Sequence, residues 1–150
     1  MAPRSTIALE FADGTVGKVY CHWDGYLEHN GQLLLKHYSN PFILRDLIDL
    51  GDISSLAPVI GTKHSFDDRA ACEGVTTFYG RDRGETGCEA VYYKDYADYR
   101  NNCQFEEYNY ILRNVDGQAT WFVEFYGEFD GLLAQAIMDE QDAKAQEEMA

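Results

Sequence analysis

The stretch TIALEFADGTVGKVYCHW, residues 6–23, determines more of the fold than any other part of this chain. It contains two apolar runs, 6–11 and 15–23, separated by Asp13-Gly14. An Asp-Gly pair between two such runs favours the tight turn that matches the twist of the flanking strands. We therefore predict a β-hairpin in which Asp13 and Gly14 are the loop residues and Phe11 lies opposite Val16.

This register divides the side chains of the hairpin between two faces, because successive residues of a strand point to opposite sides of a sheet. One face would hold Ile7, Leu9, Phe11, Val16 and Tyr20, and the other Ala8, Val19, Cys21 and Trp23. Both sets are apolar, so we expect the hairpin to be covered on both sides.

A second pair, Asp116-Gly117, separates the runs 107–113 and 118–126 and predicts a second hairpin. With those two residues as the loop, the facing pairs are Leu112 with Trp121, Tyr110 with Val123 and Tyr108 with Phe125. Helices are predicted over 33–38, with Asn30 as a possible cap, over 41–50 after the cap Asn40-Pro41, and near the C-terminus. The last is predicted from Phe129, Leu132, Leu133, Ala136 and Ile137. The expected fold class is α+β, an antiparallel sheet of two hairpins packed by helices around 31–50 and a C-terminal helix.

The chain has 150 residues and 45% hydrophobic content, which predicts one folded domain over 1–138. Residues 139–150 form an acidic helical tail that we expect to fray. We expect loops over 52–68 and 80–87 and a strand over 74–79, whereas periodicity does not decide between helix and strand over 88–106. The absence of a long apolar run argues against a membrane span, and Met1–Thr6 lack a signal-peptide core.

Charge is the strongest indication of function. The net charge is −14, and residues 101–150 carry eleven acidic and two basic residues, or −9. Such a field repels nucleic-acid phosphates and membrane surfaces and attracts basic protein surfaces. The residues expected to bind such a partner are Glu124, Glu128, Asp130, Asp139, Glu140 and Asp142. A solvated face that only keeps the protein soluble is the alternative.

Two weaker patterns indicate an enzyme. His22 and Asp24 are two residues apart at a strand end, where an Asp that orients a His would form half of an acid–base relay. Arg81 and Arg83 lie in a glycine-flanked loop that would suit an anionic ligand, although Asp82 and Glu85 beside them favour surface ion pairs. GxSxG, GxGxxG and P-loop motifs are absent, and we predict no cofactor.

The four cysteines, Cys21, Cys72, Cys88 and Cys103, contain no CxxC pair, and no two histidines are four residues apart. These spacings argue against a zinc site, and we predict no metal. In a reducing compartment the cysteines would be free thiols, while one disulfide remains an alternative.

Three stretches resemble a group of small uncharacterised proteins encoded by tailed bacteriophages and prophages. They are RSTIALEFADGTVGKVYCHWDGYLEHNGQLLLKHY (Arg4–Tyr38), LGDISSL (Leu50–Leu56) and FYGRDRGET (Phe78–Thr86), and the similarity is weaker after Cys88. The resemblance implies origin in a mobile element and a location in the host cytoplasm. It supplies no catalytic residues, because no activity is established for that group.

Small acidic phage accessory proteins are often inhibitors of host defence or of host nucleic-acid enzymes. We therefore expect a binding protein rather than an enzyme, one that occludes a basic surface of a host protein such as a CRISPR effector. The alternatives are a small hydrolase or transferase that uses His22, Asp24, Arg81 and Arg83, and an assembly module of the virion or its replication machinery. The oligomeric state is not determined by the sequence.

Overall fold

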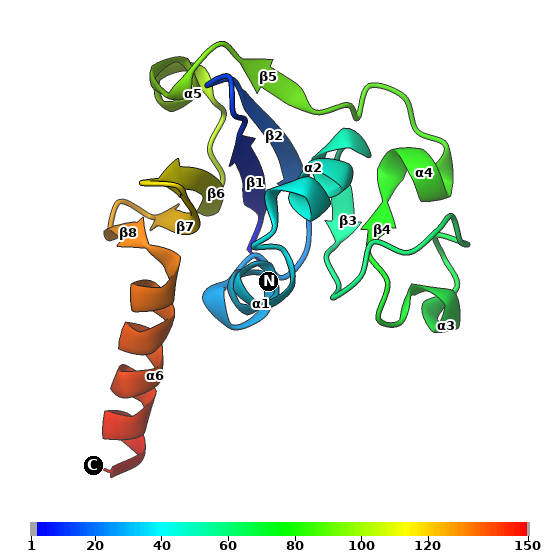
Figure 1. Ribbon diagram of the computed structural model, residues 1–150. Helices are drawn as coiled ribbons and strands as arrows, with labels where there is room; N and C mark the ends of the chain where they lie inside the picture. Colours follow the sequence, from blue (N-terminus) through cyan, green and yellow to red (C-terminus); the bar gives the residue numbers. More distant parts are fainter. Residues whose placement is uncertain (1–2, 150) are drawn as a thin grey trace.

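A mixed sheet with helices on both faces is seen in the computed structural model, which describes residues 3–149 (Figure 1). Its strands are β1 Ser5–Glu10, β2 Val16–Cys21, β3 Ile53–Ser55, β4 Thr77–Phe78, β5 Val91–Tyr93, β6 Tyr108–Val115, β7 Gln118–Phe125 and β8 Phe129–Leu132. The helices are the π-helix η1 Leu27–Gly31, α1 Gln32–His37, α2 Pro41–Asp49, α3 Arg69–Cys72, α4 Tyr79–Arg83, α5 Tyr96–Asn102 and α6 Leu133–Met149. Met1, Ala2 and Ala150 lie outside the described residues, so the predictions for these three positions are not tested.

The strand order is β4-β3-β2-β1-β6-β7-β8, and β5 pairs with the start of β2. The α+β class is confirmed, and both Asp-Gly hairpins form. The hairpins are joined through β1 and β6, which run parallel with Ile7 opposite Tyr110. The sheet is therefore mixed, and the expectation of an antiparallel sheet was wrong at this junction and at the parallel pair β2 and β3.

The first hairpin is shifted by one residue from the predicted register. Ile7 lies opposite Val19, because the loop comprises residues 12–14 and the amide of Phe11 donates to the carbonyl of Thr15. Gly14 has a φ of 92°, the left-handed conformation that a three-residue hairpin loop requires. The shift moves Val19 and Cys21 to the face of Ile7, so the predicted division of the faces was wrong.

The second hairpin has the predicted register. Leu112 lies opposite Trp121, and the two loop residues Asp116 and Gly117 have φ values of 52° and 85°. Positive φ at both positions defines the turn that fits a two-residue hairpin loop.

The first hairpin is covered on both faces, as the sequence predicts. The larger core packs one face against α1, α2 and the start of α6, and includes Ile7, Val19, Leu44, Tyr110 and Leu133. The smaller core lies on the opposite face under β5 and α5, and includes Ala8, Val16, Ile111, Tyr93 and Tyr99. The first hairpin thus lies between two packed cores.

The helix α2 begins where the sequence predicts and ends one residue earlier than predicted, at Asp49. The side chain of Asn40 accepts a hydrogen bond from the amide of Phe42, and Gly51, with a φ of 86°, follows the end. Leu44 and Leu47 are buried, whereas Ile43 is 42% exposed, so only one side of α2 faces the core. Asn30 does not cap α1, because it is buried within η1 and donates to the Ser5 hydroxyl.

Several short elements differ from the predictions. β3 lies inside the predicted loop 52–68, and α4 occupies the first half of the predicted loop 80–87. Residues 129–132 form the edge strand β8, so the C-terminal helix begins only at Leu133. No helix within residues 3–149 is both long enough and apolar enough to cross a membrane.

Candidate functional site

The C-terminal helix α6 carries most of the predicted acidic binding residues. Leu133, Ala136 and Ile137 are buried against the sheet, and the helix then extends away from the body, with Glu140 alone half-buried (Figure 1). We call residues 138–149 the acidic arm. It contains five carboxylates and one lysine, a net charge of −4. A charged segment held away from the fold on a helix is accessible to a large partner.

One side of the acidic arm contacts the body. Lys144 forms an ion pair with Glu28 of η1, and its Nζ lies 4.0 Å from Oε1 of Glu140. Burial raises the pKa of Glu140 above its ordinary value. Asp139 accepts a hydrogen bond from Gln135 and remains exposed, as does Asp142. The carboxylates on the outer side are therefore available to a partner.

The other predicted acidic residues do not join this surface. Glu124 and Asp130 pair across β7 and β8, on the face of the sheet that α5 covers. Glu124 accepts a hydrogen bond from Asn109, and Asp130 lies 4.0 Å from Arg100. Glu128 is exposed in the turn between the two strands. The structure therefore divides the predicted acidic set between two faces of the sheet.

His22 and Asp24 do not form a relay. β2 ends at Cys21, and Asp24 has a φ of 57°, so the alternation that would place both on one face stops before it. Nδ1 of His22 instead lies 2.6 Å from the hydroxyl of Tyr20. The positive φ of Asp24 belongs to the turn that positions Gly25. The carbonyl of Gly25 accepts a hydrogen bond from the hydroxyl of Tyr110.

The side chain of Arg81 is bound by other groups of the protein. Its guanidinium is only 11% exposed and donates to the buried carboxylate of Asp82, with Nε 3.0 Å from Oδ1. The remaining nitrogens donate to the backbone carbonyls of Ile60, Gly61 and Thr76. An anionic ligand would have to displace these contacts, so the geometry does not favour Arg81 as an anion clamp.

Arg83 is exposed and pairs with Glu85 at 2.5 Å. The hollow beside Arg81, of about 330 Å³, is also lined by Asp49, Glu85 and Glu89. Three carboxylates around one arginine make this hollow unfavourable for an anion.

A cluster that the sequence analysis missed brings together the loop before α3, the end of α3 and Asp82 of α4. Sγ of Cys72 is 3.8 Å from Nδ1 of His64, and Nε2 of the same ring is 3.5 Å from Oδ2 of Asp82. Cys72 follows His64 by eight positions, and Asp82 follows Cys72 by ten. No single helix or strand contains all three, so no periodic pattern in the sequence links them.

A groove of about 660 Å³ lies between the two hairpin loops and the start of α2. Phe42 at its rim is 79% exposed. Within the groove, both carboxylate oxygens of Glu10 accept hydrogen bonds from Arg113, which also lies over the ring of Tyr96. The groove is lined mostly by apolar residues, and its one acidic and one basic side chain pair with each other, so it is locally neutral in a protein of net charge −14.

Comparison with family models, with curated proteins and with solved structures finds no match for this chain. The phage resemblance consequently remains an expectation. Over residues 3–149, no three side chains of the metal-ligating types are placed to hold an ion together.

Proposed function

We propose that this protein is a phage-encoded accessory protein of the host cytoplasm, and that it inhibits a host nucleic-acid-handling protein by covering its basic surface. The acidic arm is the observation that supports this proposal. A helix whose last turns are solvated receives little stabilisation from tertiary packing. Its exposed face instead presents carboxylates at helical spacing, which matches the chemistry of a groove lined by lysine and arginine.

The attraction in this proposal comes from exposed charges, which salt screens within about 8 Å at physiological ionic strength. Binding should therefore weaken as salt is raised, mainly through slower association. Duplex DNA should compete with the protein for the same partner, because both would occupy one basic surface.

The test is a comparison of two charge-matched triple variants. The arm variant carries Asp139→Asn, Glu140→Gln and Asp142→Asn. The control carries Asp46→Asn, Asp49→Asn and Glu89→Gln, three exposed carboxylates outside the arm. Each is used to capture proteins from a bacterial lysate, and the affinity of a recovered DNA-binding protein is measured at two salt concentrations.

We expect the control to retain binding and the arm variant to lose at least about tenfold in affinity at low salt, since each close charge pair contributes about 1 kcal/mol or more. Equal binding by the two variants, or binding that duplex DNA does not compete, would contradict the proposal.

A second candidate function, assembly into a larger structure, is favoured by one observation. Phe42 is 79% exposed beside the neutral apolar groove, and a two-fold related copy inserting its own Phe42 there would bury both. Sedimentation of the wild type and of Phe42→Ser over a range of concentrations tests this candidate. A wild type that stays monomeric at high concentration would exclude it.

A further inference from the structure

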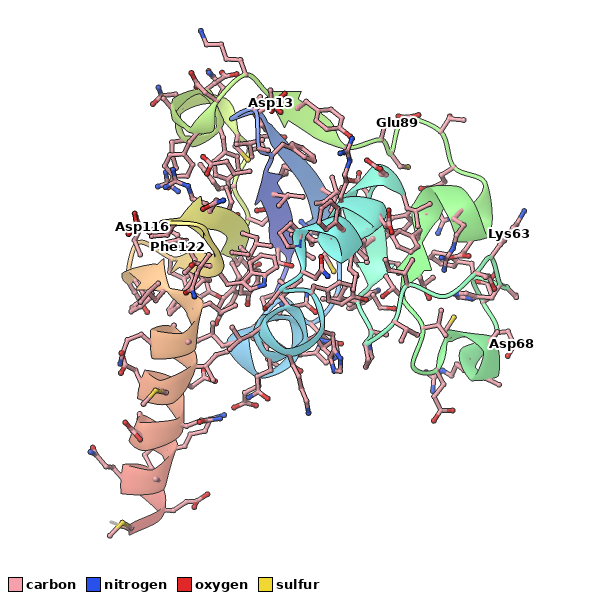
Figure 2. All side chains as sticks on the ribbon, viewed as in Figure 1. Asp13, Lys63, Asp68, Glu89, Asp116 and Phe122 are labelled. Atoms are coloured by element: carbon pink, nitrogen blue, oxygen red, sulfur yellow. The ribbon has the colours of Figure 1, made fainter. Side chains whose placement is uncertain are left out.

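Cys72 differs from the other cysteines in its surroundings. It is the last residue of α3, and it is partly exposed. Asp68, which begins that helix, lies at the margin of the molecule far from α6 (Figure 2). Within residues 3–149, Cys72 is the one cysteine whose sulfur has an imidazole nitrogen within hydrogen-bonding distance, Nδ1 of His64 at 3.8 Å. A nucleophilic thiol with an adjacent proton acceptor is the basic arrangement of an activated cysteine.

The imidazole of His64 is oriented from its other side. Nε2 faces the carbonyl of Thr76 at 3.3 Å and Oδ2 of Asp82 at 3.5 Å. Because both are acceptors, they favour a proton on Nε2. Nδ1 then faces the carbonyl of Ser65 at 3.0 Å and Sγ of Cys72 at 3.8 Å, and of these two neighbours only the thiol can donate to it. Asp82 is itself fixed by hydrogen bonds from Arg81 and from the amide of Phe78.

A protonated imidazole is also accommodated here. Once Nδ1 carries a proton, it has the carbonyl of Ser65 at 3.0 Å as an acceptor. In the resting state, Sγ of Cys72 lies 3.4 Å from the carbonyl of Phe66 and 3.6 Å from that of Ser65, contacts that a thiol donates. The thiolate therefore forms as the proton passes to His64 during reaction.

We propose that Cys72 is a thiol-modification site that forms a mixed disulfide with small neutral or cationic aliphatic disulfides, with His64 as the proton acceptor. The proton of Cys72 moves to Nδ1, and the sulfur attacks one sulfur of the disulfide. The disulfide bond breaks as the new S–S bond forms, and the departing thiolate takes the proton back from His64. No net oxidant is consumed besides the disulfide itself.

The charge around the site selects the reagent. Residues 67–73 hold the acidic Asp67, Asp68 and Glu73 and one cation, Arg69, which leaves this stretch with a charge of −2, and the whole protein has a net charge of −14. An anionic disulfide is repelled by this field, whereas a cationic one is concentrated near it.

The other thiols have environments that oppose ionisation. Burial raises the pKa of Cys21 to about 11, and it leaves that side chain fully enclosed. Burial, followed by the carboxylate of Glu85, raises the pKa of Cys88. Burial also raises the pKa of Cys103. Selective reaction at Cys72 is thus expected from both geometry and charge.

The test uses cystamine as a cationic probe and glutathione disulfide as an anionic one, with intact mass and peptide mapping over time. We expect the first cystamine adduct on Cys72, formed at least about tenfold faster than adducts on Cys88 or Cys103, a lower limit for general base assistance. His64→Gln should remove most of this advantage, and Cys72→Ser should remove the first adduct. Cys88→Ser is the matched control and should leave the rate at Cys72 unchanged.

A second measurement keeps the test independent of variant stability. The same wild-type reaction in concentrated urea should show the four cysteines reacting at similar rates, because the folded environment that selects Cys72 is gone. The proposal is overturned if Cys88 or Cys103 reacts first in the native protein, if native and unfolded selectivities agree, or if glutathione disulfide reacts as fast as cystamine.

Discussion

Replacement of Asp82 by alanine should lower the free energy of unfolding far more than its place in a charged, glycine-flanked stretch of the sequence suggests. Its side chain is completely buried, and it accepts hydrogen bonds from Nε of Arg81 at 3.0 Å, from the amide of His64 at 3.1 Å and from the amide of Phe78 at 2.8 Å. Removing one partner of a buried ion pair costs about 3–5 kcal/mol, because the remaining groups stay buried without a counterpart. We expect the free energy of unfolding of Asp82→Ala to fall by about 4 kcal/mol.

The neighbouring ion pair supplies the control. Arg83 and Glu85 have side chains that are 50% and 37% exposed, so Glu85→Ala should change the free energy of unfolding by less than about 1 kcal/mol. Urea unfolding followed by tryptophan fluorescence measures both variants against the wild type. A loss below about 1 kcal/mol for Asp82→Ala, or equal losses for the two variants, would refute the reasoning.

The same residue gives a pH dependence. Burial by itself would raise the pKa of Asp82, but the hydrogen bonds from Arg81, Phe78 and His64 outweigh it and hold the pKa below its ordinary value of 3.8. The carboxylate therefore contributes its full stabilisation above about pH 3.8, and this contribution is lost as the pH falls through the pKa of the folded protein. The difference in the free energy of unfolding between the wild type and Asp82→Ala should accordingly become smaller in acid.

Three further predictions concern the interior. Gly25→Ala would place its Cβ 2.9 Å from the carbonyl oxygen of Pro3 and should lower the free energy of unfolding by about 1–3 kcal/mol. Gly80→Ala is the control, because the nearest atom to its Cβ would be 3.7 Å away, and it should be neutral or stabilising in the same urea titration. Tyr110→Phe leaves the carbonyl of Gly25 buried without its hydrogen bond and should cost about 1–3 kcal/mol by thermal unfolding. Leu133→Ala opens a cavity where α6 joins the core and should cost about 2–5 kcal/mol, with faster amide exchange along α6 if the helix depends on this anchor.

The sequence by itself determined the features that depend on neighbouring residues. Asp116-Gly117 predicted a hairpin and its register, because a two-residue loop leaves one way to pair the flanking strands. Asn40-Pro41 predicted the start of α2 for a similarly local reason, since one side chain supplies the cap. The positions of the acidic residues in the sequence alone located the concentration of negative charge at the end of the chain.

Tertiary structure decided the features for which local rules allow several solutions. Asp13-Gly14 is compatible with a two-residue or a three-residue loop, and the observed loop is the one that places Val19 and Cys21 with Ile7 in the larger core. The strands β3 and β4 contain three and two residues, too few for a periodic signal, and exist through their pairing with distant segments.

The same holds for both candidate sites. His64, Cys72 and Asp82 come together because the loop before α3 folds back onto α4, and Asp82 holds that loop through its buried hydrogen bonds. The acidic residues of β7 and β8 separate from those of α6 because the pleat directs them to the face under α5. Local chemistry specifies which turns and caps form, whereas contacts between residues remote in sequence decide which side chains meet, because the free energy of burial depends on the whole fold.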